Sequence, residues 1–368
     1  YDMYAGMPGE IVLLREYARI AGDHAAKDLA DRALAFLGRR LREARYAVRP
    51  LGLFAGWGSV LWLRTILART GGGAHHAEEA ERLLAEVPFE ELIAVDGSYS
   101  LIKGAAGLIY ACAEIHAITG SQRSRELGEK ALSHLLSARH GEGPGLSWRI
   151  ASASPLSGLS HGASGFAVAF ARMFAATQDE RFHDACLETL KFEATLFDPV
   201  EGNWEDRRDV AVRSGERFAM SWAHGAPGIG IARLAIMQDG IRSNDIVGDV
   251  EAAIEAVSKY EGGEDPAVIS GDFGRAELLL RAEEVLGMPP SRAARQRLDA
   301  LLPQGIDSVR RTRVGNYPHG LLGGLTGIGY QALRMADPSV PRLIGLQSLS
   351  ARCQEPSVRR RGAIALEV

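Results

Sequence analysis

The chain has 368 residues, of which 46% are hydrophobic, and a formal net charge of −4 at pH 7. This composition is typical of a water-soluble globular protein with enough apolar residues for a large core. The weakly acidic balance argues against nucleic acid or an anionic membrane as the main partner. No apolar run approaches the length of about 18 residues that predicts a membrane-spanning helix.

Three cysteines, Cys112, Cys186 and Cys353, lie far apart in the chain. Their odd number and wide spacing predict neither a disulfide framework nor a cysteine-cluster metal site. Free cysteines are typical of a reducing compartment, and the sequence has no signal peptide, so we expect a cytoplasmic protein.

Short glycine turns recur along the chain, and an apolar helical segment follows each of them. Successive turns are 46 to 63 residues apart, which leaves room for two helices and their connections in each repeat. The first glycines of these turns are Gly6, Gly56, Gly104, Gly162, Gly225, Gly271 and Gly324.

Polar segments between the turns have apolar residues at i, i+3, i+4 and i+7, which predicts helices with one wet face. The segments after the glycines are apolar nearly all round, as in helices buried on both sides. The sequence therefore predicts an all-α fold, a closed α/α toroid (a double α-barrel) of seven inner and seven outer helices. Short strands are expected only at residues 145–153 and 267–271. Outer helices are expected at residues 24–44, 124–139, 180–197, 249–262 and 292–303.

In such a toroid the inner helices would all begin at the same end. Their N-termini would then leave unpaired N–H groups around a central cavity and favour an anion there. His161 and His224 each stand directly before a Gly-x-x-Gly turn, in the same register, and are candidate catalytic residues. His319 precedes the last turn in a different register. For any single glycine, tight helix packing is an equally good explanation.

Five segments resemble the cyclase domain of class II lanthipeptide synthetases, which belong to the lanthionine synthetase C-like family. The resemblance runs from residue 1 to 346, so we expect one toroidal domain over 1–346 and a C-terminal tail over 347–368. It also implies that a dehydratase domain precedes this chain in a longer synthetase. The segments are GLSHGASGFAVAFARM, FDPVEGNWEDRR, SWAHGAPGIGIARL, GDFGRAELLL and HGLLGGLTGIGYQALRMADP.

Members of this family close thioether rings: a cysteine thiol of a precursor peptide adds to a dehydroalanine or dehydrobutyrine. The resemblance implies a zinc ion held by a cysteine in one turn and by a Cys-His pair before the next. In this chain Ala223, Ile269 and Ser270 occupy those positions. We therefore expect no metal and no other cofactor, because the family's zinc ligands have been replaced.

The resemblance also assigns candidate roles around the cavity. His161 matches the family's catalytic histidine, and His224 occupies a position where class II relatives often have histidine. Ser100 stands where the zinc cyclases commonly carry an aspartate. Asp272 is expected first of all to cap the helix that follows it. The candidate substrate-binding residues are Trp222, Ser100, Ser270, Asp272 and His319.

Three functions remain open from the sequence. The first is a zinc-independent cyclase that forms lanthionine-type or aminovinyl-cysteine rings, with a dehydratase/kinase domain or a flavin-dependent decarboxylase as partner. The second is a non-catalytic domain that binds the precursor peptide or scaffolds partner enzymes. The third is a toroid recruited to a different reaction. Retention of His161 and His224 favours the first, whereas Ser100 and Ala223 favour the others.

Overall fold

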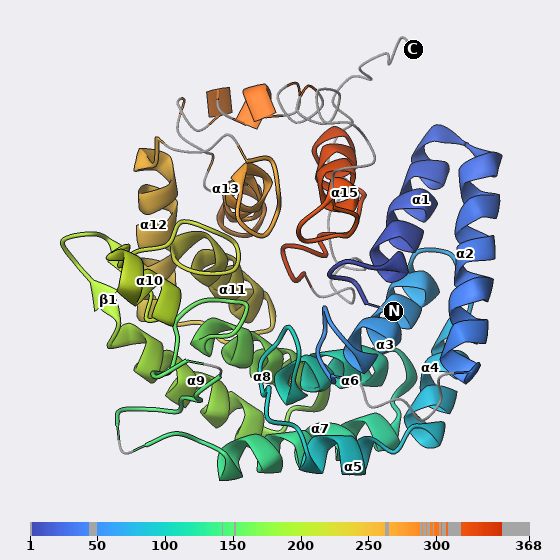
Figure 1. Ribbon diagram of the computed structural model, residues 1–368, viewed down its shortest axis with the longest axis horizontal. Coiled ribbons are helices and arrows are strands. Elements are labelled where there is room, and N and C mark those ends of the chain that lie inside the picture. The colour runs from blue at the N-terminus through green and yellow to red at the C-terminus, as the bar shows by residue number, and fades with distance from the viewer. Residues whose placement is uncertain are drawn as a thin grey trace.

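The computed structural model describes residues 2–43, 50–141, 143–150, 152–261, 265–287 and 318–347, together with scattered positions between 289 and 307. Its helices form an inner ring enclosed by an outer layer (Figure 1). The predicted all-α toroid is confirmed. The inner helices are α1 (Met7–Ala21), α3 (Trp57–Arg69), α6 (Ala105–Thr119), α8 (Ala163–Thr177), α11 (Ala226–Gln238), α13 (Asp272–Leu286) and α15 (Leu325–Ala336).

The outer layer of the described chain contains five long helices, and two short helices lie in the connections between the longer elements. Four of the long helices match the predicted outer segments, and the segment expected at 292–303 lies largely outside the described residues, as does the tail after residue 347. These helices are α2 (His24–Glu43), α4 (His75–Glu86), α5 (Phe89–Ala94), α7 (Gln122–Ser137), α9 (Glu180–Ala194), α10 (Asp209–Ser214) and α12 (Asn244–Lys259).

Strands are limited, in the described residues, to an antiparallel pair between α9 and α11. β1 (Phe197–Asp198) pairs with β2 (Asn203–Trp204). Neither predicted strand forms: the described part of 145–153 has no ladder partner, and 267–271 is a turn. The apolar residues there enter the core from a loop, a pattern that short apolar runs share with strands.

Every inner helix begins after the first glycine of a predicted turn, which is its N-cap residue. The inner helices are buried on more sides than the outer helices, as their apolar patterns predict. In α6 all residues from Ala105 to Ile115 are buried, whereas α7 buries a single stripe of side chains against it. No helix in the described part of the chain is long and apolar enough to cross a membrane.

A closed ring of backbone hydrogen bonds joins the seven turns at the N-terminal end of the inner helices. Each link joins residues that lie one or two positions before the first glycine of neighbouring turns, with N···O distances of 2.8 to 3.4 Å. The last turn bonds back to the first, so the toroid closes on itself. The donor and acceptor pairs are Tyr4 to Phe54, Ala55 to Ile102, Ile102 to Ser160, Ser160 to Ala223, Ala223 to Ile269, Ile269 to Leu322 and Leu322 to Tyr4.

This ring leaves no room for side chains at the second glycine of a turn. A Cβ on Gly107 would lie 2.1 Å from the backbone nitrogen of Leu53, in the neighbouring turn. On Gly228 it would lie 2.0 Å from the carbonyl oxygen of Trp222. Glycine is required at both positions because backbone approaches backbone there.

The first N–H groups of the inner helices are not free, contrary to the prediction of unpaired donors. In several turns the first helical residue donates to the carbonyl seven residues earlier: Trp57 to Pro50 (2.9 Å), Ala163 to Leu156 (3.0 Å) and Leu325 to Pro318 (3.0 Å). In these turns the loop before the helix folds back over its N-terminus and supplies the acceptors. Charge at this end of the toroid therefore has to come mainly from side chains.

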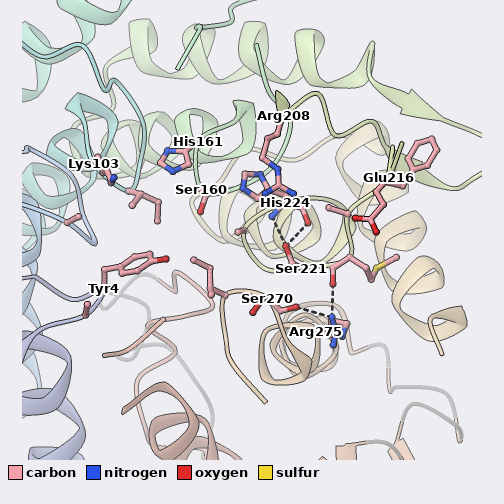
Figure 2. A pocket seen from close by; sticks show the side chains of 18 of the residues that line it. Tyr4, Lys103, Ser160, His161, Arg208, Glu216, Ser221, His224, Ser270 and Arg275 are labelled. Atoms are coloured by element: carbon pink, nitrogen blue, oxygen red, sulfur yellow. Dashed lines mark hydrogen bonds between the residues drawn. The ribbon is translucent and has the colours of Figure 1, made fainter. Parts of the chain in front are cut away.

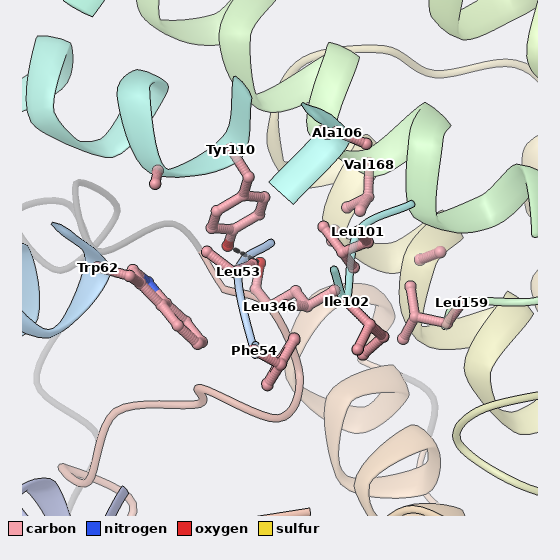
Figure 3. Close-up of a cluster of buried hydrophobic side chains, with 14 of the residues drawn as sticks. Leu53, Phe54, Trp62, Leu101, Ile102, Ala106, Tyr110, Leu159, Val168 and Leu346 are labelled. Carbon is pink, nitrogen blue, oxygen red and sulfur yellow. Dashed lines mark hydrogen bonds between the residues drawn. The ribbon is translucent and has the colours of Figure 1, made fainter. Parts of the chain in front are cut away.

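The interior of the ring is filled in part by the segment that follows α15. Leu343, Ile344 and Leu346 are almost completely buried. The Tyr110 hydroxyl of α6 donates to the Leu346 carbonyl oxygen over 3.2 Å, among apolar side chains from several turns (Figure 3). The indole of Trp222 donates to the Ile344 carbonyl oxygen over 2.9 Å. This segment thus ties together inner helices that are distant in sequence.

Candidate functional site

A cavity of about 1180 Å³ opens where the inner helices begin (Figure 2). Its floor consists of side chains from positions one and two residues before the first glycine of six of the seven turns, positions that also form the backbone ring. One wall comes from the connection between β2 and α11, including Arg208 and residues 216–221. The floor residues are Tyr4, Ala5, Ala55, Ile102, Lys103, Ser160, His161, Ala223, His224, Ile269 and Ser270.

His161 stands directly before α8 and is half-buried in this floor. Its Nδ1 lies 3.0 Å from the hydroxyl oxygen of Ser100. Burial, with the positive charges of Lys103 and Arg208, lowers the pKa of His161 to about 4. The imidazole is therefore neutral at pH 7.

His224 occupies the equivalent place before α11 and is 8% exposed. Its Nδ1 is buried and has no hydrogen-bond partner among the described residues. Burial and the charge of Arg208 lower the pKa of His224 to about 3, although Asp206 acts in the opposite direction. The rings of His161 and His224 are 6.5 Å apart between centroids, so two neutral imidazoles face one space.

Arginines of the cavity wall are paired with carboxylates outside the lining. Arg208 forms a 2.6 Å ion pair with the buried carboxylate of Asp206. Arg275 pairs with Asp272 at 2.8 Å and donates to the Met220 carbonyl oxygen. Lys103, in contrast, is exposed in the same register as the two histidines, and it lies beside His161. Lys103 is the only lysine or arginine among the floor residues named above, so its ammonium group gives the floor a positive charge.

The model of lanthionine synthetase C-like proteins matches residues 1–346. The chain belongs to this family. Among solved structures, nisin cyclase is similar, with a TM-score of 0.71 and 15% identity over 95% of this chain and 92% of that chain. At this identity the likeness shows the shared toroidal fold alone. The closer resemblance to class II synthetases stays a prediction.

Two epimerases are similar to a smaller extent. A sugar epimerase from a ruminal bacterium has a TM-score of 0.49 and 12% identity, over 77% of this chain and 87% of that chain. Cellobiose 2-epimerase from Bacillus thermoamylovorans has a TM-score of 0.48 and 12% identity, over 76% and 86%. A comparison with curated proteins gives no match.

Two of the candidate substrate-binding residues lie behind the floor of the cavity and do not line it. Trp222 is fully buried, three residues before Gly225, and packs edge-to-face on Phe54 with centroids 5.3 Å apart. The same position is apolar and 0% exposed in every turn: Met3, Leu53, Leu101, Leu159, Trp222, Val268 and Leu321. Trp222 therefore belongs to the core and makes no direct contact with a cavity ligand.

Ser100 is also 0% exposed, and it reaches the cavity only through His161. The predicted direct contact with substrate is thus replaced by a contact with the candidate catalytic residue.

Asp272 and His319 lie outside the lining as well. Asp272 is engaged by Arg275, and no side-chain cap bond forms at the start of α13. His319 stands five residues before Gly324, and 65% of its side chain is exposed. Its Nδ1 lies 3.8 Å from Oε1 of Glu10. Its different register, already visible in the sequence, takes it out of the cavity. Ser270 does line the floor, where its hydroxyl donates to Asp265.

Two cavity residues, Lys103 and Arg208, were not predicted from the sequence. A signal existed for Lys103, because it precedes Gly104 as His161 precedes Gly162 and His224 precedes Gly225. Arg208 ends one of the family-like segments, but only the folding of residues 197–220 over the cavity brings it near His224.

The side chains at the zinc positions that the family resemblance implies do not fit a zinc ion. Ala223 and Ile269 have no donor atom, and Ser270 alone has a hydroxyl that is bound to Asp265. No group of three His, Cys, Asp or Glu residues suited to a metal exists in the described part of the chain. Cys112 and Cys186 are buried elsewhere, and burial raises the pKa of each thiol to about 12.

Proposed function

We propose that this family member closes thioether rings in a ribosomally made precursor peptide without zinc. A peptide cysteine loses its thiol proton, its sulfur bonds to the β-carbon of dehydroalanine or dehydrobutyrine, and the α-carbon then takes a proton. The observation that carries this proposal is the placement of His161 beside the positive charge of Lys103 in the cavity of a lanthionine synthetase C-like toroid.

The size of the cavity supports a peptide substrate. A volume of about 1180 Å³ exceeds the range of about 300 to 1,000 Å³ typical of small-molecule pockets. The floor is apolar at Ala5, Ala55, Ile102, Ala223 and Ile269, and its other side chains are polar. Such a surface suits a peptide segment whose cysteine and dehydro residue are held next to each other. Correct orientation of the two reacting groups supplies much of the rate in an addition of this kind.

The energetics do not require a metal. A thiol with a pKa of about 8.5 is roughly 3% thiolate at pH 7. Deprotonating the peptide thiol at this pH therefore costs about 2 kcal/mol. Lys103 supplies a positive charge beside His161 that favours the thiolate and the enolate that follows. Because both imidazoles have strongly lowered pKa values, we infer that the thiol proton leaves to water.

A synthetic peptide with one dehydroalanine and one cysteine tests this function. We expect the wild-type chain to consume free thiol faster than buffer alone, as measured by alkylation and mass spectrometry. His161→Ala and Lys103→Met should each slow ring formation about tenfold or more. Lys130→Met, on the exposed side of α7, is the matched control and should leave the rate unchanged. Equal alkylation with wild type and with buffer eliminates the proposal.

A second candidate is peptide binding without catalysis. The weak basicity of His161 and His224 favours it, because neither imidazole readily accepts a thiol proton. In that case the peptide should bind, as seen by calorimetry, with no thiol loss above buffer. The proposed partners are the precursor peptide and the dehydratase/kinase domain or flavin-dependent decarboxylase that would prepare it in the cytoplasm.

A further inference from the structure

We propose that Ser100 fixes His161 in the tautomer with its proton on Nε2, so that His161 offers the cavity a neutral N–H donor. This inference deepens the proposed function, and it rests on that function only for the identity of the group that accepts the bond. Ser100 is then a positioning residue that acts through His161.

The hydroxyl of Ser100 has a single hydrogen-bond acceptor among the described residues. Ser100 is 0% exposed, which excludes bulk solvent. Its oxygen accepts a long hydrogen bond from the backbone N–H of Lys103 at 3.4 Å. Among the described residues, the only acceptor within hydrogen-bond range of that hydroxyl is Nδ1 of His161, at 3.0 Å.

The alternative tautomer leaves a buried donor unsatisfied. If Nδ1 of His161 carried the proton, it would donate to the serine oxygen, and the serine hydrogen would have no acceptor. Buried donors without partners are rare because their desolvation is not compensated. We expect this difference to favour the Nε2–H form by about tenfold or more.

The other edge of the ring is available to a ligand. His161 lines the cavity, and with Nδ1 turned to Ser100 the opposite nitrogen is left for the open side. Nε2 has no hydrogen-bond partner among the described residues and is not one of their buried unpartnered atoms, so it is at least partly accessible from the cavity. The charged groups that face the ring, Lys103 and Arg208, are both positive and disfavour a charged imidazolium.

A neutral N–H donor beside a cation suits an acceptor that becomes negative. In the proposed addition, the carbonyl oxygen of the dehydro residue gains charge as the C–S bond forms. His161 Nε2–H would donate to that oxygen and keep its proton, and Lys103 would stabilise the charge. The proton that reaches the α-carbon would come from water, so the step needs no other co-reactant.

Nitrogen NMR of the folded chain tests the tautomer without any substrate. In ¹⁵N-histidine-labelled protein at pH 7, with His161 assigned from His161→Gln, we expect an unprotonated Nδ1 and a protonated Nε2. Two other histidines serve as internal references, because carbonyl oxygens only accept. His116 has Nδ1 3.0 Å from the Ser121 carbonyl, and His134 has Nε2 2.8 Å from the Asp96 carbonyl.

Variants at position 100 separate positioning from simple packing. Ser100→Thr keeps the hydroxyl and should keep the wild-type His161 signals. Ser100→Asp introduces an acceptor without a donor and should move the proton to Nδ1 and raise the pKa of His161. A protonated Nδ1 in the wild type, or wild-type signals in Ser100→Asp, overturns the inference. If the signals behave as expected and no variant closes a ring, the tautomer stands and the proposed function fails.

Discussion

The backbone N–H of Ala223 donates to the carbonyl oxygen of Ile269 over 3.2 Å. These residues are 46 positions apart, and their side chains line the same cavity. They also occupy two of the three zinc-ligand positions that the family resemblance implies. The backbone ring therefore still brings the ligand positions together, and only the side chains lack donor atoms.

A zinc site should be recoverable by substitution alone. We expect the triple variant Ala223→Cys, Ile269→Cys, Ser270→His to bind about one equivalent of zinc, because it restores two thiolates and an imidazole on adjacent backbone. Elemental analysis after dialysis, and the absorption of bound cobalt, measure it. The wild-type chain is the control and should retain well under one equivalent. A full equivalent in the wild type contradicts this account.

The close packing of turns predicts a large cost for a single methyl group. Gly107→Ala would place a Cβ 2.1 Å from the Leu53 nitrogen, so two turns of the ring must separate. We expect a loss of about 3 kcal/mol in the free energy of unfolding, measured with urea. Gly248→Ala, on exposed α12 with open space around it, is the matched control and should gain about 0.5 to 1 kcal/mol. Similar effects at both glycines would show that the turns are not tightly packed.

The buried charges at the opposite end of the inner helices predict another stability effect. Arg172 pairs with Glu114 and with Asp239, and it donates to the Leu346 carbonyl oxygen over 2.7 Å. Arg172→Met would leave two buried carboxyl groups without a cation, at a cost of about 3 to 5 kcal/mol. Thermal and urea unfolding measure this. Arg181→Met, at an exposed ion pair, should cost less than about 1 kcal/mol.

The lowered pKa of His224, about 3 in the folded chain against 6.5 ordinarily, predicts a pH dependence of stability. As the pH falls below 6.5, the unfolded chain takes up this proton and the folded chain does not. The part of the free energy of unfolding that depends on an uncharged His224 is therefore fully present above pH 6.5. It is lost on acidification, by about 2 kcal/mol between pH 7 and pH 5.

Comparison with a variant isolates that contribution from those of His161 and His76, whose pKa values are also lowered. His224→Gln should lose about 2 kcal/mol less than the wild type between pH 7 and pH 5, measured by urea unfolding at both values. His319→Gln, at an exposed histidine, should follow the wild type. If His224→Gln also follows it, the pKa of His224 is the same in the folded and the unfolded chain.

Much of the fold could be predicted because its signals are local. All seven inner helices begin at the glycine expected from the sequence, since apolar periodicity and a glycine N-cap are properties of neighbouring residues. The shared register of His161 and His224 likewise predicted that both would reach one cavity. The loss of the zinc ligands that the family resemblance implies stays a prediction from residue identity at positions 223, 269 and 270.

What the sequence by itself determined was the number and order of the inner helices, the family, and which end of these helices faces the cavity. Only the tertiary structure decided that Trp222 points into the core, that Ser100 lies behind His161, and that Lys103 adds a charge beside it. Side-chain direction in these loops depends on hydrogen bonds between turns that are 46 or more residues apart. Such long-range backbone contacts form only when the ring closes, and no local pattern encodes them.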